Sequence, residues 1–318
     1  MSVQRSLTPG RRRILVLLQV GSAAAVLWAL LSLFGTEPLR RAAGVLSPAT
    51  VLAALGVGLV VTVLQTARWR LVSDGFGVAL APRHALVQVY QASFLNSVLP
   101  GGLTGDAVRA LRQGAAPGAS YRSGIGSVVG ERLAGTVIVL LAAVLATAPL
   151  SLPVAAVLGA ATLVAIALTW PSLGRLGPQP AALVWLLSVA CWCALAALFL
   201  LAAANVLSDV GPTAGLALAA ICLAGMTVPL SVGGWGPREA VTAVAAMGYG
   251  LTGPDGLAVS AAYGLLALVS TAPGAVLLAV RALTGAAAGL RRAGVAEGEL
   301  GADVAPQQEA SGRGGQST

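Results

Sequence analysis

Long runs of apolar residues dominate this chain and constrain its fold more than any other feature. A helix needs about 20 apolar residues to cross a bilayer, and six runs reach or approach that length: 14–34, 49–67, 124–148, 151–170, 181–204 and 257–280. Of the 318 residues, 57% are hydrophobic and 9% are charged, whereas a soluble domain carries about 25% charged residues. The sequence therefore predicts an all-α polytopic membrane protein.

The two ends of the chain differ from this membrane part. The run at 14–34 follows three arginines and resembles a signal peptide, but it is long enough to span and lacks a small-x-small cleavage site before Glu37. We interpret it as a retained first span, preceded by a cytoplasmic N-terminus at residues 1–13. Residues 282–318 are rich in Gly, Ala, Gln and Ser, which predicts a disordered cytoplasmic tail and leaves 14–281 as the membrane domain.

Two further apolar segments, 84–112 and 214–250, are interrupted near their middles by glycine, proline and charge. Non-helical backbone is tolerated at membrane depth only where protein or a watery cavity satisfies its polar groups. We therefore predict about six full spans plus two re-entrant helical hairpins. Two full spans at 214–232 and 236–250 remain an alternative, which gives eight spans, although the second is short for a crossing.

The arginines predict the orientation, because cytoplasmic loops collect basic residues. The net charge of +8 comes from Arg alone, since the chain has no Lys. With the N-terminus inside, only Arg40 and Arg41 fall in an outer loop. The arginines then counted as cytoplasmic are Arg5, Arg11, Arg12, Arg13, Arg68, Arg70, Arg83, Arg112, Arg122, Arg175, Arg281, Arg291 and Arg292. We expect a multi-pass protein of a bacterial plasma membrane with both termini cytoplasmic, and this scattered charge does not indicate nucleic-acid binding.

The two interruptions resemble each other. Residues 99–110 read LPGGLTGDAVRA and residues 232–243 read VGGWGPREAVTA. Three predicted spans separate them, so the second copy is inverted relative to the first, as in many transporters with broken helices at the midplane. The match is short, and a chance similarity remains open because the chain contains 40 glycines.

Each interruption opens a half-helix, with Thr104 and Gly236 as candidate N-caps. Such helix starts attract anions, phosphate in particular. Charged residues gather nearby: Asp106, Arg109, Glu131, Arg132, Arg238 and Glu239. Because a charge at the bilayer centre costs at least about 2.5–3.5 kcal/mol, we predict a shared polar cavity. The alternative is three internal ion pairs, since these six charges sum to zero.

The candidate substrate-binding residues are Asn96, Gly101, Gly102, Gly105, Asp106, Arg109, Glu131, Arg132, Gly233, Gly234, Gly236, Arg238 and Glu239. Gln88, Gln91 and Ser97 suit either a hydrated path beside Asn96 or hydrogen bonds between helices. We predict no metal, cofactor or catalytic site. The three cysteines lie in apolar runs, the single histidine is remote from them, and GGLTG lacks the GK[ST] of a nucleotide-binding loop.

Four motifs resemble the flippase-like family, which is also named for the transmembrane domain of lysylphosphatidylglycerol synthases such as the multiple peptide resistance factor. They are RWRLV (68–72), SFLNSVLPGGLTGDAVRA (93–110), GSVVGERLAG (126–135) and VPLSVGGWGPREA (228–240). The resemblance implies a helical fold with re-entrant elements that translocates a lipid, which in bifunctional members is aminoacylated phosphatidylglycerol. The matching positions are Asn96, Pro100, Gly101, Gly105, Arg109, Glu131, Arg132, Gly233, Gly234, Gly236, Arg238 and Glu239.

Bifunctional members of that family carry a cytosolic aminoacyl transferase domain after the membrane part, and the present sequence has none, so we expect no synthase activity. The leading hypothesis is a translocator of an anionic phospholipid or lipid-linked glycan. A second hypothesis is a non-transporting accessory subunit of a separate envelope enzyme, and the chain could also form a homo-oligomer. A membrane-embedded enzyme using Glu131 and Asp106 as acid and base is the least supported, because no nucleophile or metal set accompanies them.

Overall fold

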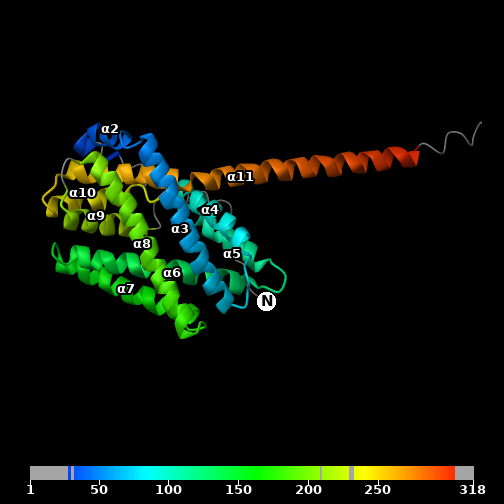
Figure 1. Cartoon of the computed structure of the whole chain (residues 1–318), viewed down its shortest axis with the longest axis horizontal. Helices are drawn as coiled ribbons and strands as arrows, with labels where there is room; N and C mark the ends of the chain where they lie inside the picture. Colours follow the sequence, from blue (N-terminus) through cyan, green and yellow to red (C-terminus); the bar gives the residue numbers. More distant parts are fainter. Residues whose placement is uncertain (1–27, 30–31, 208–209, 229–232, 305–318) are drawn as a thin grey trace, which may run out of the picture. The chain divides into compact units, whose positions relative to one another are not determined.

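The structure is a computed structural model that describes residues 28–29, 32–207, 210–228 and 233–304, with side chains to residue 284. Within this part, all regular elements are α-helices (Figure 1). Their bounds are α2 Glu37–Ala43, α3 Pro48–Gly75, α4 Pro82–Val98, α5 Thr104–Gly114, α6 Tyr121–Thr147, α7 Leu152–Leu173, α8 Pro178–Val206, α9 Pro212–Gly225, α10 Pro237–Gly248 and α11 Gly253–Val304. Most of the expected first span at 14–34 lies outside the described residues.

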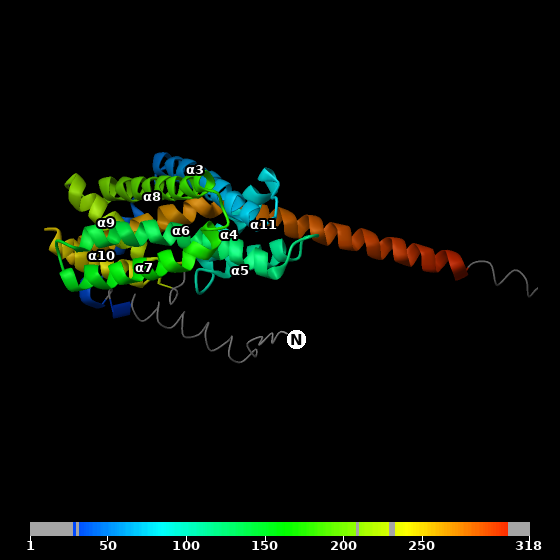
Figure 2. The same cartoon turned by 90° about the horizontal axis from the view of Figure 1, so that it is seen from below.

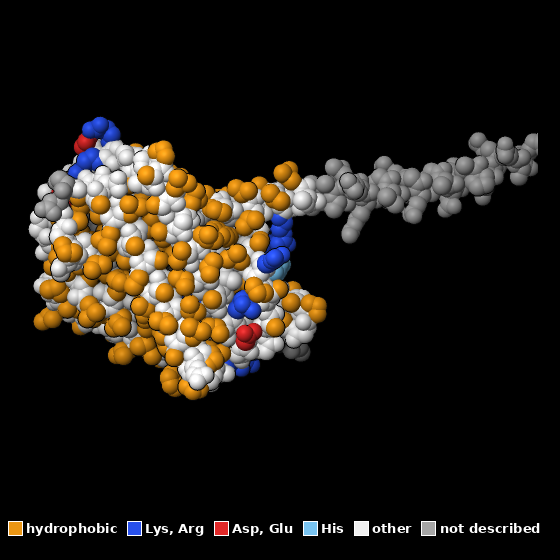
Figure 3. Space-filling model, viewed as in Figure 1, with side chains coloured by type: hydrophobic (Ala, Val, Ile, Leu, Met, Phe, Trp, Pro, Cys, Tyr) orange, Lys and Arg blue, Asp and Glu red, His pale blue; other side chains and the backbone are white. Residues whose placement is uncertain are grey.

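Five helices in the described part are long and apolar enough to cross a membrane: α3, α6, α7, α8 and the Gly253–Thr284 part of α11. They correspond to five of the six predicted spans. Figure 3 shows apolar side chains covering the middle of the helical body, while charged side chains gather over α2 at one end and near α3–α5 at the other. The all-α class is confirmed, and the protein is a multi-pass membrane protein.

Two helix–break–helix pairs interrupt this set at the predicted places. The first pair is α4 and α5, the second is α9 and α10, and the helices of each pair are packed together. The longest of the four, α4, has 17 residues, which at 1.5 Å per residue is about 25 Å and falls short of an apolar core of about 30 Å. These short lengths fit hairpins better than full spans.

Each break carries two consecutive glycines with left-handed backbone. The φ angles are 86° and 59° at Gly101 and Gly102, and 59° and 85° at Gly233 and Gly234. Residues with a side chain rarely adopt a positive φ, so glycine at these positions lets the chain turn between helices. A Cβ placed on Gly233 would lie 2.0 Å from the carbonyl oxygen of Ser97. The second break therefore lies directly against the end of α4.

Helix α6 is the centre of the packing, because it contacts α3, α5, α7, α8 and α9. Figure 2 shows α6 and α7 lying side by side along their length. A separate apolar core forms where α8, α9 and α11 meet, around Phe199, Leu218 and Leu266. Together these contacts place α3, α5, α7, α8 and α9 around α6.

The chain forms two compact units, Met1–Gly274 and Ala275–Thr318. In the second unit the α11 backbone stays helical to Val304, so the helix includes much of the segment expected as a disordered tail. Alanine, the strongest helix former, occupies seven of the positions 282–304, and glycine occupies five. Residues 305–318 lie outside the described part.

Candidate functional site

A cavity of about 540 Å³ lies among the two breaks and helices α3, α4, α6, α8 and α11. Its volume is in the range of pockets that hold small molecules, about 300–1,000 Å³. Gly101 and Gly102 line it from the first break, and Gly233 and Gly234 line it from the second. Two segments more than a hundred residues apart in the sequence thus line the same cavity.

Five charged side chains line this cavity, and they form a continuous network of ion pairs. We call them the charged cluster: Arg68, Asp106, Arg109, Glu131 and Arg132. Three arginines and two carboxylates give it a net charge of +1. The cluster links α3, α5 and α6, which also pack together through the apolar side chains of Trp69, Ala110 and Val128.

Glu131 sits at the centre of the charged cluster and is 3% exposed. Its Oε2 accepts a hydrogen bond from Arg109 at 2.8 Å, and its Oε1 accepts one from Arg68 Nε at 2.9 Å. The Arg109 guanidinium also stacks on Trp69, 4.5 Å from the ring centroid. Since removing one partner of a buried ion pair leaves an uncompensated charge, Glu131 is the counter-charge that allows two arginines to be buried.

Arg68 is the residue of this cluster that sequence reasoning missed. We had counted it among the arginines of cytoplasmic loops, but it lies inside α3, is 5% exposed, and bonds both Glu131 and the hydroxyl of Ser188 on α8 at 3.0 Å. The family motif at 68–72 marks the segment, yet the partner lies 63 residues away. Only the tertiary structure brings the two together.

Arg132 differs from the other two arginines because its side chain is 45% exposed. It donates to Asp106 Oδ2 at 2.6 Å and to the carbonyl of Gly102 at 3.2 Å. A guanidinium has five N–H donors, so these two bonds leave donors for a ligand. Arg132 is therefore the most accessible cation of the charged cluster.

The start of α5 is fixed by Asn96 on α4. The Asn96 amide donates to Asp106 Oδ2 at 3.0 Å and accepts from the Gly105 backbone N–H at 2.8 Å. Gly105 lies against α4, where an added Cβ would be 2.1 Å from the Ala92 carbonyl. Thr104 is the first residue of α5 rather than its N-cap, which is Leu103, because the Asn96 side chain takes over the capping bond.

Arg238 and Glu239 form a second, neutral pair outside the cavity wall. Arg238 Nη2 lies 2.5 Å from Glu239 Oε1, and both side chains are at most 1% exposed. Gly236 is the N-cap of α10, as predicted, and its N–H donates to Glu239 Oε2 at 2.7 Å. Arg238 also lies 5.8 Å from the ring centroid of Tyr263, which lines the cavity. The expected chamber of six charges is thus a five-membered cluster including Arg68, plus this separate pair.

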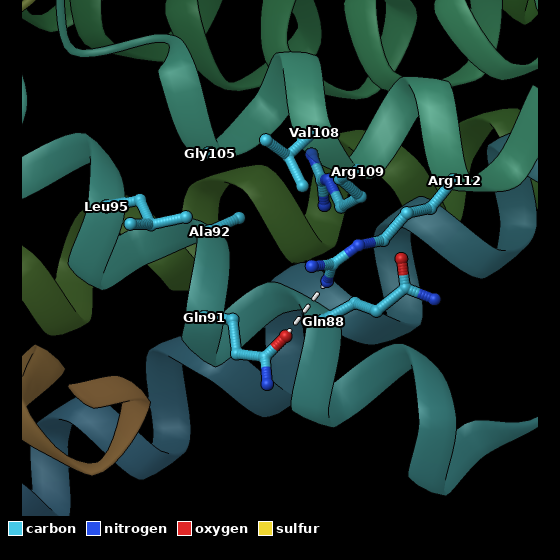
Figure 4. Close-up of a pocket in the computed structure, with 8 residues that line it drawn as sticks. All are labelled: Gln88, Gln91, Ala92, Leu95, Gly105, Val108, Arg109 and Arg112. Atoms are coloured by element: carbon cyan, nitrogen blue, oxygen red, sulfur yellow. Dashed lines mark hydrogen bonds between the residues drawn. The ribbon is translucent and has the colours of Figure 1, made fainter. Parts of the chain in front are cut away.

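A smaller pocket lies between α4 and α5, and Figure 4 shows the side chains of the two helices facing each other across it. Arg112 donates to Gln91 there at 3.0 Å. The pocket has no room for a water molecule, so Gln91 serves as a contact between helices. Asn96 and Ser97, by contrast, line the main cavity.

Of the thirteen candidate residues, the structure places nine on the wall of the main cavity: Asn96, Gly101, Gly102, Asp106, Arg109, Glu131, Arg132, Gly233 and Gly234. The other four lie behind that wall. Gly105 allows the α4–α5 contact, and Gly236, Arg238 and Glu239 build the start of α10.

Helix breaks that line a charged cavity within a set of apolar helices define a class of polytopic membrane protein with a buried polar site. The sequence profile of the lysylphosphatidylglycerol synthase transmembrane region matches residues 14–177. The chain belongs to this family. The matched region contains the first break and the whole charged cluster. The comparison with curated proteins found no match to the chain.

Proposed function

We propose that the protein translocates an anionic phospholipid or a lipid-linked glycan between the two leaflets. The headgroup would cross through the main cavity while the acyl chains stay in the bilayer. The observation that carries this proposal is the charged cluster, which has a net charge of +1 and a half-exposed Arg132 at the meeting point of two helix breaks.

In this proposal arginine supplies the main phosphate contacts, and the half-helix starts of α5 and α10 contribute their remaining N–H groups. The N–H groups of Gly105 and Gly236 already donate to Asn96 and Glu239. Arg132 has spare donors, and arginine binds phosphate well because its donors form a planar fork. Asp106 and Glu131 then act as positioning residues that hold Arg132 and Arg109 at the cavity wall.

The order of elements supports an inverted repeat as part of the proposal. Each half has a short helix, a break with two left-handed glycines, a second short helix and a long apolar helix. Two such halves rocking against each other would open the cavity to one leaflet at a time. The sequence has no nucleotide-binding motif, so we propose downhill or ion-coupled transport and no enzymatic step.

Leaflet exchange in reconstituted vesicles tests the proposal. A fluorescent anionic phospholipid is placed in both leaflets, and a membrane-impermeant quencher reports how fast the inner pool reaches the outer leaflet. We expect faster exchange than in protein-free vesicles, and a loss of it in Arg132→Gln. Exchange equal to that of protein-free vesicles across several anionic lipids, together with co-purification of one stoichiometric partner, would instead support an accessory subunit.

A further inference from the structure

Each carboxylate oxygen of the main cavity already accepts at least one hydrogen bond from the protein itself. Asp106 Oδ1 accepts from Arg109 at 3.1 Å, and its Oδ2 accepts from Asn96 and Arg132. Both oxygens of Glu131 accept from arginines. No other acidic residue lines the cavity within the described part of the chain. A cationic group entering the cavity would therefore meet a net charge of +1 and no free carboxylate.

The unused hydrogen-bond donors beside the cavity favour an anionic ligand over a cationic one. The Nε of Arg109 and the Nε1 of Trp192 are buried and have no hydrogen-bond acceptor among the described residues. Both residues line the cavity, and the Arg109 side chain is only 3% exposed. Neither atom is exposed to the cavity, so a ligand would instead meet the unused N–H groups of Arg132, whose side chain is 45% exposed. Acceptor oxygens, such as those of a phosphodiester, would bind these groups.

A set of hydroxyl side chains lines the same cavity. The hydroxyls of Thr62, Ser270 and Thr271 each donate their proton to a carbonyl one turn earlier in the same helix, at 2.7, 2.7 and 2.9 Å. A hydroxyl has one proton and two lone pairs, so these oxygens remain as neutral acceptors. Neutral acceptors suit the O–H donors of a glycerol or sugar without supplying the negative charge that an ammonium group needs.

From these three features we infer that the cavity selects an anionic phospholipid whose headgroup carries free hydroxyls, and that it rejects the aminoacylated, cationic form of such a lipid. The inference rests on the proposed function and names its substrate class. It separates this chain from the aminoacyl lipid in the family's name, because selectivity here follows from the charge count of five side chains in this cavity.

A paired exchange assay tests the selectivity. Vesicles of phosphatidylcholine with one-fifth unlabelled phosphatidylglycerol receive either fluorescent phosphatidylglycerol or fluorescent lysylphosphatidylglycerol, at equal trace amounts. We expect the protein to accelerate exchange of the first probe at least about tenfold more than that of the second. Equal or faster exchange of the lysyl probe overturns the inference and leaves the proposed function standing. Exchange of neither probe contradicts the proposed function itself.

A single added charge provides a second test. Gln65 lines the cavity from α3 and takes part in none of the ion pairs, so Gln65→Glu lowers the charge of the wall from +1 to zero at nearly constant volume. We expect the preference for phosphatidylglycerol to fall about tenfold, as a unit charge a few ångströms away at intermediate dielectric implies. Gln65→Met is the neutral control and should keep the wild-type ratio. An unchanged ratio in Gln65→Glu overturns the inference.

Free glycerol phosphate distinguishes a lipid substrate from a soluble one with the same headgroup chemistry. The same vesicles are incubated with radiolabelled glycerol 3-phosphate outside. We expect no uptake above protein-free vesicles, because the cavity would be entered from the bilayer with the acyl chains outside the protein. Uptake of the free compound overturns the assignment to a lipid headgroup.

Discussion

At the scale of single residues, the charged cluster combines a structural role and a proposed ligand-binding role in different side chains. Glu131 and Arg109 are buried and form an ion pair with each other, whereas Arg132 has N–H donors to spare and is half exposed. Structural and ligand-binding roles should therefore separate by mutation. A buried ion pair is weak evidence for stability when both partners can be replaced, but removing one partner alone is strongly destabilising.

Replacing Glu131 with Gln should destabilise the fold. The change leaves the buried guanidinium groups of Arg68 and Arg109 without their shared counter-charge, which costs about 3–5 kcal/mol for a buried pair. Thermal unfolding in detergent micelles measures the loss as a lower midpoint. Glu37→Gln is the control, because Glu37 forms an exposed pair with Arg40 and its removal should leave the midpoint unchanged. A midpoint for Glu131→Gln equal to wild type contradicts the ion-pair network.

Arg132→Gln should reduce leaflet exchange at least about tenfold, because it removes one charge-assisted phosphate contact of about 1.5–3 kcal/mol. The unfolding midpoint should stay within a few degrees of wild type. The side chain is 45% exposed, so its removal creates little unpaired buried charge. Arg40→Gln removes an exposed arginine of α2 and should leave exchange intact. Normal exchange in Arg132→Gln would remove the central cation from the proposal.

At the scale of elements, the breaks were predictable and their mutual contact was not. Paired glycines before a charged helix start marked both breaks in the sequence, and the structure gives all four of those glycines positive φ. The span predicted at 49–67 ends at its first arginine, but α3 continues to Gly75. Sequence pattern treats Arg68 as the end of an apolar run, since nothing local shows that Glu131 on another helix neutralises it.

The contact between the second break and α4 predicts a specific effect of Gly233→Ala. The new alanine would have to adopt a positive φ, and its Cβ would lie 2.0 Å from the Ser97 carbonyl oxygen. We therefore expect the close contact to destabilise the fold by about 1–3 kcal/mol beyond the backbone strain. Gly77→Ala is the matched control, because Gly77 has a φ of 73° but nothing within 4 Å of an added Cβ. Equal unfolding midpoints for the two variants would show that the second break does not lie against the end of α4.

At the scale of the whole molecule, composition determines the class of protein, and the arginines predict its orientation. The apolar surface between two charged ends in Figure 3 fits a protein that spans the bilayer. The arginine distribution predicts which end faces the cytoplasm, whereas the position of Gly233 against Ser97 of α4 follows from a long-range contact that no local pattern contains.

Cysteine labelling tests this topology in intact cells. With the three native cysteines replaced by serine, Ala79→Cys in the α3–α4 loop and Pro117→Cys in the α5–α6 loop should both react with an impermeant maleimide only after the membrane is opened. Ala43→Cys in α2 should react from outside. The reason is that α4 and α5 form a hairpin that enters and leaves the membrane from the cytoplasmic side, whereas α3 crosses the membrane and separates position 43 from position 79. Labelling of positions 79 and 117 from opposite sides contradicts the paired arrangement.

The most direct measurement is a cryo-electron microscopy map of the protein bound to a Fab, in nanodiscs made with an anionic phospholipid. The account predicts phosphate-sized density within hydrogen-bond distance of the Arg132 guanidinium, between Gly101–Gly102 and Gly233–Gly234, with acyl-chain density leaving toward the bilayer. A well-resolved cavity that contains only water or acyl chains, with every lipid phosphate at the membrane surfaces, would contradict it.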